Sequence, residues 1–364
     1  MSLTRIPAAD AAAALDSFDA IIDARSESEY AADHLPGAVN WPSLTDAERA
    51  VVGTRYRQIS DFEARRLGAA LVARNIAGHL EREVQDKPRD WRPLVYCWRG
   101  GKRSGTLAWF LDQIGFRVHL LDGGYKAFRR VVAAELAQLP LRFGFSVVCG
   151  RTGSGKTRLL HALAAAGAQV LDLEALAAHR GSVLGLVPGR PQPTQKAFET
   201  AIWDALRRLD PARPLFVESE SRKIGNLRVP EALIERMRRD SACLHVEMPQ
   251  PARVALLLED YAFFADDPEL FCAQLEALVE VRGRADVNAW QALARAGRWA
   301  EVYAALMAEH YDPMYLKSMQ RNFAGFEQAT PVALEDGAPA TLARVARQLV
   351  EDERAQALQS RPAR

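Results

Sequence analysis

The sequence predicts an α/β protein with two parallel-sheet domains followed by a helical region. Short apolar runs alternate with amphipathic stretches in the first part of the chain, and a second series of this kind begins near residue 143. Beyond about residue 250 the apolar residues follow the helical period. Strands separated by helices form parallel sheets with helices on both faces. We therefore expect domains over residues 1–138 and 139–250, and a helical extension over 251–364 that packs on the second domain.

The first series opens with the apolar run FDAIIDAR, typical of a buried strand, and closes with a helix before Pro140. The expected strands cover 18–25, 93–97 and 118–124, with a further short strand inside 27–42, and the expected longer helices cover 62–80, 103–115 and 125–139.

The second series begins with the apolar run FGFSVVCG, followed at once by a glycine-rich loop and a helix. The expected strands cover 143–150, 168–174, 214–221 and 243–249, and the expected helices cover 156–167 and 196–209. The helical extension contains long amphipathic stretches at 251–264, 269–283 and 288–315.

Composition and charge exclude several classes of protein. The 364 residues include 47 Lys plus Arg and 46 Asp plus Glu, so the bulk charge does not favour nucleic acid or an anionic membrane. The four cysteines show neither a CxxC pair nor Cys/His metal spacing, which argues against a zinc site or a disulfide framework. No run of about 18 uncharged apolar residues occurs, and no secretory apolar core stands at the N-terminus. We expect a cytoplasmic protein without a membrane span.

Residues 150–157, GRTGSGKT, match the pattern G-x-x-x-x-G-K-[ST] in full, after an apolar strand and before a helix. Glycines let backbone N–H groups turn toward phosphate oxygens, and the helix N-terminus and Lys156 add positive charge. The Thr157 hydroxyl can bind Mg²⁺ if a metal is used. The sequence thus predicts a diphosphate-binding loop without establishing nucleotide hydrolysis. Its members are Gly150, Arg151, Thr152, Gly153, Ser154, Gly155, Lys156 and Thr157.

Four carboxylates near the ends of two predicted strands are candidates for binding a metal or a substrate. They are Asp172 and Glu174 in LDLE, and Glu218 and Glu220 in VESES. Each pair has i, i+2 spacing, which places both side chains on the same face of a strand. The aspartate that ATPases usually carry after a long apolar run is missing.

A second glycine-rich loop, CWRGGKRS, begins with Cys97 at the end of a predicted strand, where open parallel sheets bind ligands. Clustered cations and the N–H groups of a helix N-terminus favour the thiolate, which is the reactive form of cysteine. An isolated cysteine is usually a buried structural residue, but so many cations around an inert thiol would be costly. We therefore expect Cys97 to be catalytic. The anion-binding residues of this loop are Arg99, Gly100, Gly101, Lys102, Arg103 and Ser104.

Two chemistries fit this loop. The spacing C-x5-R-S is that of tyrosine phosphatases, whereas a cysteine loop on a parallel sheet also resembles the rhodaneses, in which the thiolate carries sulfur or selenium. The flanking motifs favour the second, because both rhodanese signatures occur in the expected order. The opening motif is matched by Asp23, Arg25, His34, Pro36, Gly37 and Ala38, and the closing motif by Asp122, Gly123 and Gly124. The loop is one residue longer than in ordinary rhodaneses, so it has room for a phosphate-bearing donor.

A rhodanese-like module containing YCWRGGKRS, followed directly by a P-loop NTPase-like module, resembles the tRNA 2-selenouridine synthase family over nearly the whole chain. The segments LDLEALAAHRGSVLG and VESESRKIG match that family's second domain. The resemblance implies a transferase that replaces sulfur by selenium in wobble 2-thiouridine of tRNA, with selenophosphate, supplied by selenophosphate synthetase, as donor.

The same resemblance implies a geranyltransferase activity, in which geranyl diphosphate first converts the base to S-geranyl-2-thiouridine. The P-loop would bind the diphosphate and the Cys97 loop would bind the selenium donor. Selenophosphate and geranyl diphosphate are then co-substrates, no tightly bound cofactor is implied, and Mg²⁺ is left open.

Contacts with tRNA must come from local basic groups, since the bulk charge is balanced. The candidates are Arg180, Arg222 and Lys223. An alternative function is an ATP-dependent kinase or sulfurtransferase that uses a rhodanese persulfide relay. A regulatory rhodanese-like domain is disfavoured because Cys97 is present.

Overall fold

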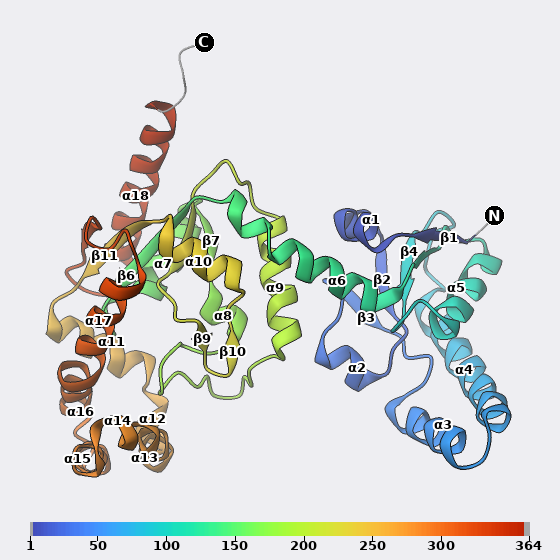
Figure 1. Ribbon diagram of the computed structural model, residues 1–364, viewed down its shortest axis with the longest axis horizontal. Coiled ribbons are helices and arrows are strands. Elements are labelled where there is room, and N and C mark those ends of the chain that lie inside the picture. Colours follow the sequence, from blue (N-terminus) through green and yellow to red (C-terminus); the bar gives the residue numbers. More distant parts are fainter. Residues whose placement is uncertain (1–2, 360–364) are drawn as a thin grey trace. The chain divides into compact units, whose positions relative to one another are not determined.

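The computed structural model describes residues 3–359, which form two compact units. The first unit runs to Glu135 and also includes residues 193–204. The second unit comprises residues 136–192 and the chain from 205 onward. Each unit is built on its own sheet (Figure 1). Within the described residues, none of the helices is both long and apolar enough to cross a membrane.

The first unit contains a five-stranded sheet whose paired strands are all parallel, as the sequence predicts. In spatial order the strands are β1 (Thr4–Ile6), β5 (His119–Leu121), β4 (Pro93–Tyr96), β2 (Ala20–Asp23) and β3 (Ala38–Asn40). The helices are α1 (Ala8–Ala13), α2 (Glu27–Ala32), α3 (Asp46–Gln58), α4 (Asp61–Glu83), α5 (Lys102–Ile114) and α6 (Gly124–Leu136). All residues of β4 and all but Ala20 of β2 are buried, because both faces of these central strands are covered.

Helix α9 (Gln195–Arg207) falls inside the predicted 139–250 segment, but residues 193–204 cluster with the first unit. The Thr200 hydroxyl donates a hydrogen bond to the Asp33 carboxylate at 3.0 Å, and Trp203 Nε1 donates to Glu135 Oε2 at 2.6 Å. The Trp203 ring also packs edge-on against Phe128 of α6. Because of these contacts with residues distant in sequence, residues 193–204, which include most of α9, belong to the first unit.

The second unit contains another five-stranded parallel sheet. Its spatial order is β12 (Thr330–Ala333), β11 (Ala242–Glu247), β6 (Phe145–Gly150), β8 (Leu215–Glu218) and β7 (Gln169–Leu171). Helices α7 (Lys156–Ala165), α8 (Leu173–Ala177), α10 (Glu231–Arg239) and α18 (Pro339–Gln359) accompany it, with a short hairpin of β9 (Lys223–Ile224) and β10 (Leu227–Arg228). Edge strand β12 is not expected from the sequence, because its four residues stand alone in a helical region.

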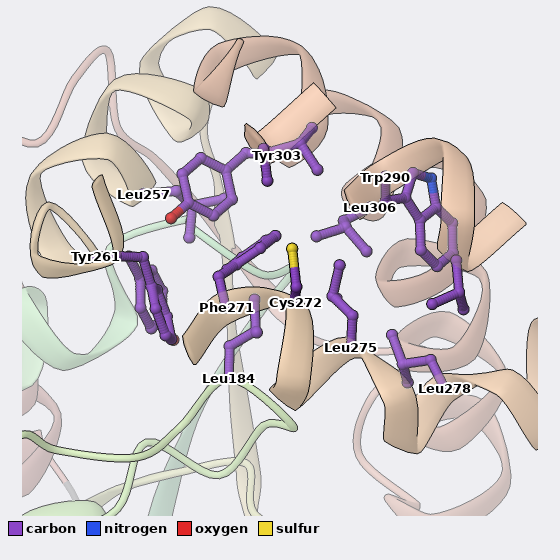
Figure 2. Close-up of a cluster of buried hydrophobic side chains, with 14 of the residues drawn as sticks. Leu184, Leu257, Tyr261, Phe271, Cys272, Leu275, Leu278, Trp290, Tyr303 and Leu306 are labelled. Carbon is purple, nitrogen blue, oxygen red and sulfur yellow. The ribbon is translucent and has the colours of Figure 1, made fainter. Parts of the chain in front are cut away.

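The remaining helices of the second unit bury a cluster of aromatic and aliphatic side chains (Figure 2). They are α11 (Gln250–Asp260), α12 (Phe263–Asp266), α13 (Pro268–Leu275), α14 (Val279–Arg282), α15 (Arg284–Arg295), α16 (Trp299–Ala305), the π-helix η4 (Leu306–Tyr311) and α17 (Asp312–Asn322). Trp290, a member of this cluster, is 2% exposed.

Candidate active sites: a P-loop cavity and a cysteine loop

The P-loop joins central strand β6 to helix α7, as its sequence requires. Gly153 and Gly155 have φ angles of +75° and +79°, a region that favours glycine. A Cβ added at Gly150 would lie 2.5 Å from Ser154 Oγ and 3.0 Å from the Val246 carbonyl oxygen. The loop therefore needs glycine for its turns and for its close approach to β11.

Tyr315 contacts both the first residue of this loop and Lys156. The backbone N–H of Gly150 donates to the Tyr315 hydroxyl at 2.6 Å, and Lys156 Nζ lies 5.9 Å from the centre of the Tyr315 ring. Lys156 Nζ otherwise donates only a long bond, 3.4 Å, to the Arg151 carbonyl among the described residues. The ammonium group is thus weakly held and available to an anion.

Three glutamates gather beside Lys156. Glu174 comes from α8, Glu218 ends β8, and Glu220 lies two residues further on; one oxygen of each lies within 4.8 Å of the others. Glu218 and Glu220 are 4% and 8% exposed. Within the described residues Glu218 Oε1 lacks a hydrogen-bond partner, although the carboxylate also interacts with the Thr157 hydroxyl.

The electrostatics of these three glutamates favour a proton or a cation. Burial raises the pKa of Glu174, Glu218 and Glu220, and charge repulsion within the group raises those of Glu174 and Glu220 further. The positive charge of Lys156 opposes this rise at all three. Carboxylate oxygens with an added hydroxyl are the donor set that Mg²⁺ prefers. These residues therefore fit a divalent cation.

The expectation that both carboxylates of each pair lie on one face of a strand is wrong. Strand β7 ends before Asp172 and β8 ends at Glu218, so the chain has turned before the second acid of each pair. Asp172 caps α8 by accepting from the Ala175 N–H at 2.8 Å, and its other oxygen lies 2.7 Å from His161 Nε2. Glu174 joins the acidic group in its place, through the helix that Asp172 begins.

A cavity of about 430 Å³ lies beside the P-loop and the three glutamates. One part of its wall is charged and includes Lys156 and Thr157. Another part is aromatic and aliphatic, formed by Val183, Leu257, Tyr261, Tyr311, Met314, Tyr315, Met319 and Phe323. The volume falls within the range of about 300–1,000 Å³ that is usual for small-ligand sites. The cavity thus combines the P-loop and its charged side chains with an apolar wall.

The candidate tRNA contacts have different surroundings. Arg180 lines the P-loop cavity, donates to the Asp260 carbonyl and lies 5.0 Å from the centre of the Tyr261 ring. Arg222 forms ion pairs with Glu231 and Glu235, so its charge is compensated. Lys223 is exposed at the start of β9.

The cysteine loop follows β4 and precedes α5, with Cys97 3% exposed. The Ser104 hydroxyl donates to Cys97 Sγ at 3.0 Å. The closing motif contacts this loop directly, because the Tyr125 N–H donates to the Cys97 carbonyl at 2.8 Å. A Cβ added at Gly124, where φ is +57°, would lie 2.2 Å from that carbonyl oxygen and 2.4 Å from Gly100 N. Glycine at 124 therefore lets the two segments meet.

The three cations of this loop are not equivalent. Arg103 donates to Glu29 Oε2 at 2.8 Å, and Arg49 lies 2.8 Å from the same oxygen. Burial acts to raise the pKa of Glu29, but its bond and charge interaction with Arg103, a backbone bond from Ser26 and the charge of Arg49 lower it to about 2. Arg99 and Lys102 are exposed, and the described residues provide neither with a carboxylate partner. These two cations are the ones available to a donor anion.

Asp23 and Arg25 of the opening motif bond to each other, and Asp23 also bonds to Tyr96, the residue before Cys97. Arg25 and Asp23 make a buried ion pair at 2.6 Å, and the Tyr96 hydroxyl donates to the same carboxylate at 2.7 Å. Arg25 also donates to the Asp33 carbonyl at 2.6 Å, one residue before His34. Glu29, Tyr96 and Tyr125 are not among the residues that the sequence predicts for this site. The Tyr96–Asp23 pair is separated by 73 positions, so no local pattern reveals it.

Comparisons with known proteins match a different domain family to each part of the chain. Residues 7–130 match the Rhodanese-like domain, and residues 143–276 match the tRNA 2-selenouridine synthase AAA domain. A protein of Sulfurovum sp. (strain NBC37-1) named tRNA 2-selenouridine synthase is 32% identical over 83% of this chain and 89% of its own length. A Bdellovibrio bacteriovorus protein of the same name is also 32% identical, with the same coverage.

A Nitrosomonas europaea protein of that name is 37% identical over 66% of this chain, and that match spans 63% of the relative, slightly less than two thirds. The longer alignments include both units and both loops in one chain. Together with the two domain matches and the geometry of the loops, they establish that the chain belongs to the tRNA 2-selenouridine synthase family.

Proposed function

We propose that this chain is a tRNA-modifying transferase that replaces the sulfur of wobble 2-thiouridine by selenium in two steps. In the first step the sulfur attacks C1 of geranyl diphosphate; the C–S bond forms, the C–O bond breaks, diphosphate leaves and the uridine loses its N3 proton. In the second step the selenium of selenophosphate attacks C2, the C2–S bond breaks and the sulfur leaves with a proton as geranyl thiol; water then takes up the phosphoryl group as the P–Se bond breaks. Selenophosphate synthetase would supply the donor.

The P-loop cavity would perform the first step. The backbone N–H groups of residues 150–157 and the Lys156 ammonium would stabilise negative charge on the departing diphosphate. The observation that carries the proposal is the single cavity that joins Lys156 to an aromatic and aliphatic wall. This combination suits an apolar chain attached to a diphosphate. Arg180, which lines the same cavity, would contact a tRNA phosphate.

The three glutamates and Thr157 would hold a divalent cation such as Mg²⁺. The unpartnered, buried Glu218 Oε1 supports this assignment, because a buried carboxylate oxygen without a donor is costly. A bound cation would add positive charge next to the diphosphate oxygens. Glu218 also holds the Thr157 hydroxyl in the loop.

The cysteine loop would perform the second step. Cys97 would guide selenophosphate to C2, since a perselenide on Cys97 would require a two-electron oxidant, while Arg99 and Lys102 neutralise the donor anion. Alkylation matters to this step because a thiolate-like group leaves badly, whereas alkylated sulfur leaves as a neutral thiol. The order of the steps follows from this difference.

Mass spectrometry of nucleosides would test the proposal. Thiolated tRNA is incubated with the protein, geranyl diphosphate and selenophosphate, and each donor is omitted in turn. We expect S-geranyl-2-thiouridine without selenophosphate, and no 2-selenouridine without geranyl diphosphate. Selenation at an unchanged rate in the absence of geranyl diphosphate would contradict the two-step scheme.

The position of Glu218 favours a second candidate function, an ATP-dependent kinase or sulfurtransferase. Glu218 ends β8, the neighbour of β6, where P-loop NTPases place their metal-binding acid. Nucleotide hydrolysis stimulated by thiolated tRNA would support this candidate and count against a prenyl diphosphate in the P-loop.

A further inference from the structure

The apolar wall of the P-loop cavity begins at the phosphate-binding loop itself. A Cβ added at Gly153 would lie 3.0 Å from Leu257 Cγ, so this side chain of α11 packs directly on the loop. Leu257 and Tyr261 are 5% and 9% exposed and both line the cavity. A chain attached to a diphosphate on this loop would therefore contact Leu257 first and Tyr261 next.

A small void continues beyond this wall. Its volume is about 10 Å³, and it shares Thr152, Ser182, Leu257, Tyr261 and Tyr311 with the cavity. The far wall of the void belongs to the buried cluster of Figure 2 and consists of Leu184, Tyr303, Leu306 and Met307. The shared residues thus separate the cavity from a gap in the hydrophobic core.

We propose that this void marks the end of the path taken by the prenyl chain, and that Leu306 and Leu184 limit the length of the chain that the enzyme accepts. The inference rests on the proposed transfer of a prenyl group from its diphosphate. The interior beyond the void is close-packed, with Leu306 1% exposed and Leu184 3% exposed. A longer chain would have to displace these side chains, and overpacking of this kind is destabilising.

Substitutions that enlarge the void supply the test. Leu306→Ala removes atoms from the far wall without touching the P-loop or its glutamates. The measurement is kcat/KM for transfer of a farnesyl group, one isoprene unit longer, relative to a geranyl group, on thiolated tRNA. We expect the farnesyl-to-geranyl ratio to rise about tenfold, since small volume changes in an apolar pocket change specificity by roughly 10- to 200-fold.

Leu275→Ala is the matched control. Leu275 is 0% exposed and belongs to the same cluster, but it does not line the void. Both variants remove the same atoms from one core, so both should lower the thermal unfolding temperature. A change of ratio in Leu306→Ala alone would support the inference. Leu184→Ala, on another part of the far wall, serves as a second variant if Leu306→Ala does not fold, and it should raise the ratio too.

The outcomes separate this inference from the function on which it rests. If the unaltered enzyme transfers geranyl groups while the folded void variants keep its farnesyl-to-geranyl ratio, the length limit lies elsewhere and the inference is overturned. An equal rise in Leu275→Ala would overturn it as well, because the effect would then reflect general loosening. If the unaltered enzyme transfers no prenyl group from any diphosphate, the proposed function itself fails, and the inference with it.

Discussion

The cysteine loop and the P-loop both join a parallel strand to the N-terminus of a helix, but their surroundings differ. Cys97 stands at the start of its loop with Arg99 and Lys102 exposed beside it. The P-loop instead places Lys156 next to three buried glutamates and an apolar wall. In both places the backbone arrangement is one that suits an anion. The comparison indicates that the neighbouring side chains decide which anion is bound and which bond is broken.

Replacing Cys97 by Ser should have the largest effect and should separate the two loops. We expect selenium incorporation to fall at least about 1,000-fold, as when other catalytic nucleophiles are removed, while geranyl transfer is unchanged. Nucleoside mass spectrometry measures both products in one sample. Loss of both products together would show that the loops do not act independently.

Replacing Lys156 by Ala should give the opposite pattern. We expect geranyl transfer to fall roughly 100-fold, because one preorganised positive group is lost from the leaving diphosphate. Selenation of tRNA that already carries S-geranyl-2-thiouridine should continue. Lys317→Ala, at an exposed position of α17, is the control for loss of a surface charge. Normal geranyl transfer by the Lys156 variant would refute its role.

A pair of glycine substitutions tests the geometry of the cysteine loop. In Gly124→Ala the added Cβ clashes with backbone atoms of Cys97 and Gly100, and alanine is also strained at the positive φ of this position. We expect this substitution to lower the stability of the first unit by about 2–3 kcal/mol and to reduce selenation strongly. Gly101→Ala meets no atom within 4 Å, so it should be tolerated. Thermal unfolding followed by circular dichroism, together with the selenation assay, compares the two. Equal behaviour of the pair would mean that close contact with the closing motif is unimportant.

The smallest expected effect concerns Glu29, which forms an ion pair with Arg103 of the cysteine loop. Because the folded-state pKa of Glu29 is about 2, below its usual 4.5, its contribution to stability is present above pH 4.5 and is lost as the pH falls toward 2. Glu29→Gln should therefore cost about 1 kcal/mol at pH 7.

Urea unfolding at several pH values measures this difference, which should shrink below pH 4.5. Glu81→Gln, on an exposed part of α4, should show no such dependence. A Glu29 effect that stayed constant down to pH 2 would contradict the ion-pair assignment.

Much of the fold and both loops follow from the sequence, because strand periodicity and glycine-rich motifs are local signals. The ends of strands are harder to predict from the sequence. The strand predicted over 118–124 ends at Leu121, because Gly124 already begins α6. The acidic site was predicted only in part. Glu174, Glu218 and Glu220, three of the four candidate carboxylates, form it, whereas Asp172 caps the short helix α8.

Contacts between distant segments explain the other differences. Nothing near Arg103 indicates that Glu29, 74 positions away, compensates its charge. Nothing within Thr330–Ala333 indicates that this segment pairs with β11. Such features depend on how the chain packs as a whole, so local patterns do not contain them.

The position of α9 has a consequence for synthesis of the chain. Residues 193–204 belong to the first unit, while the segments before and after them belong to the second. On a translating ribosome the first unit therefore cannot acquire the Thr200 and Trp203 contacts until residues 136–192 of the second unit have been made. The rhodanese-like unit is complete only when part of the P-loop unit has emerged, which ties the maturation of the unit that carries Cys97 to synthesis of the P-loop segment.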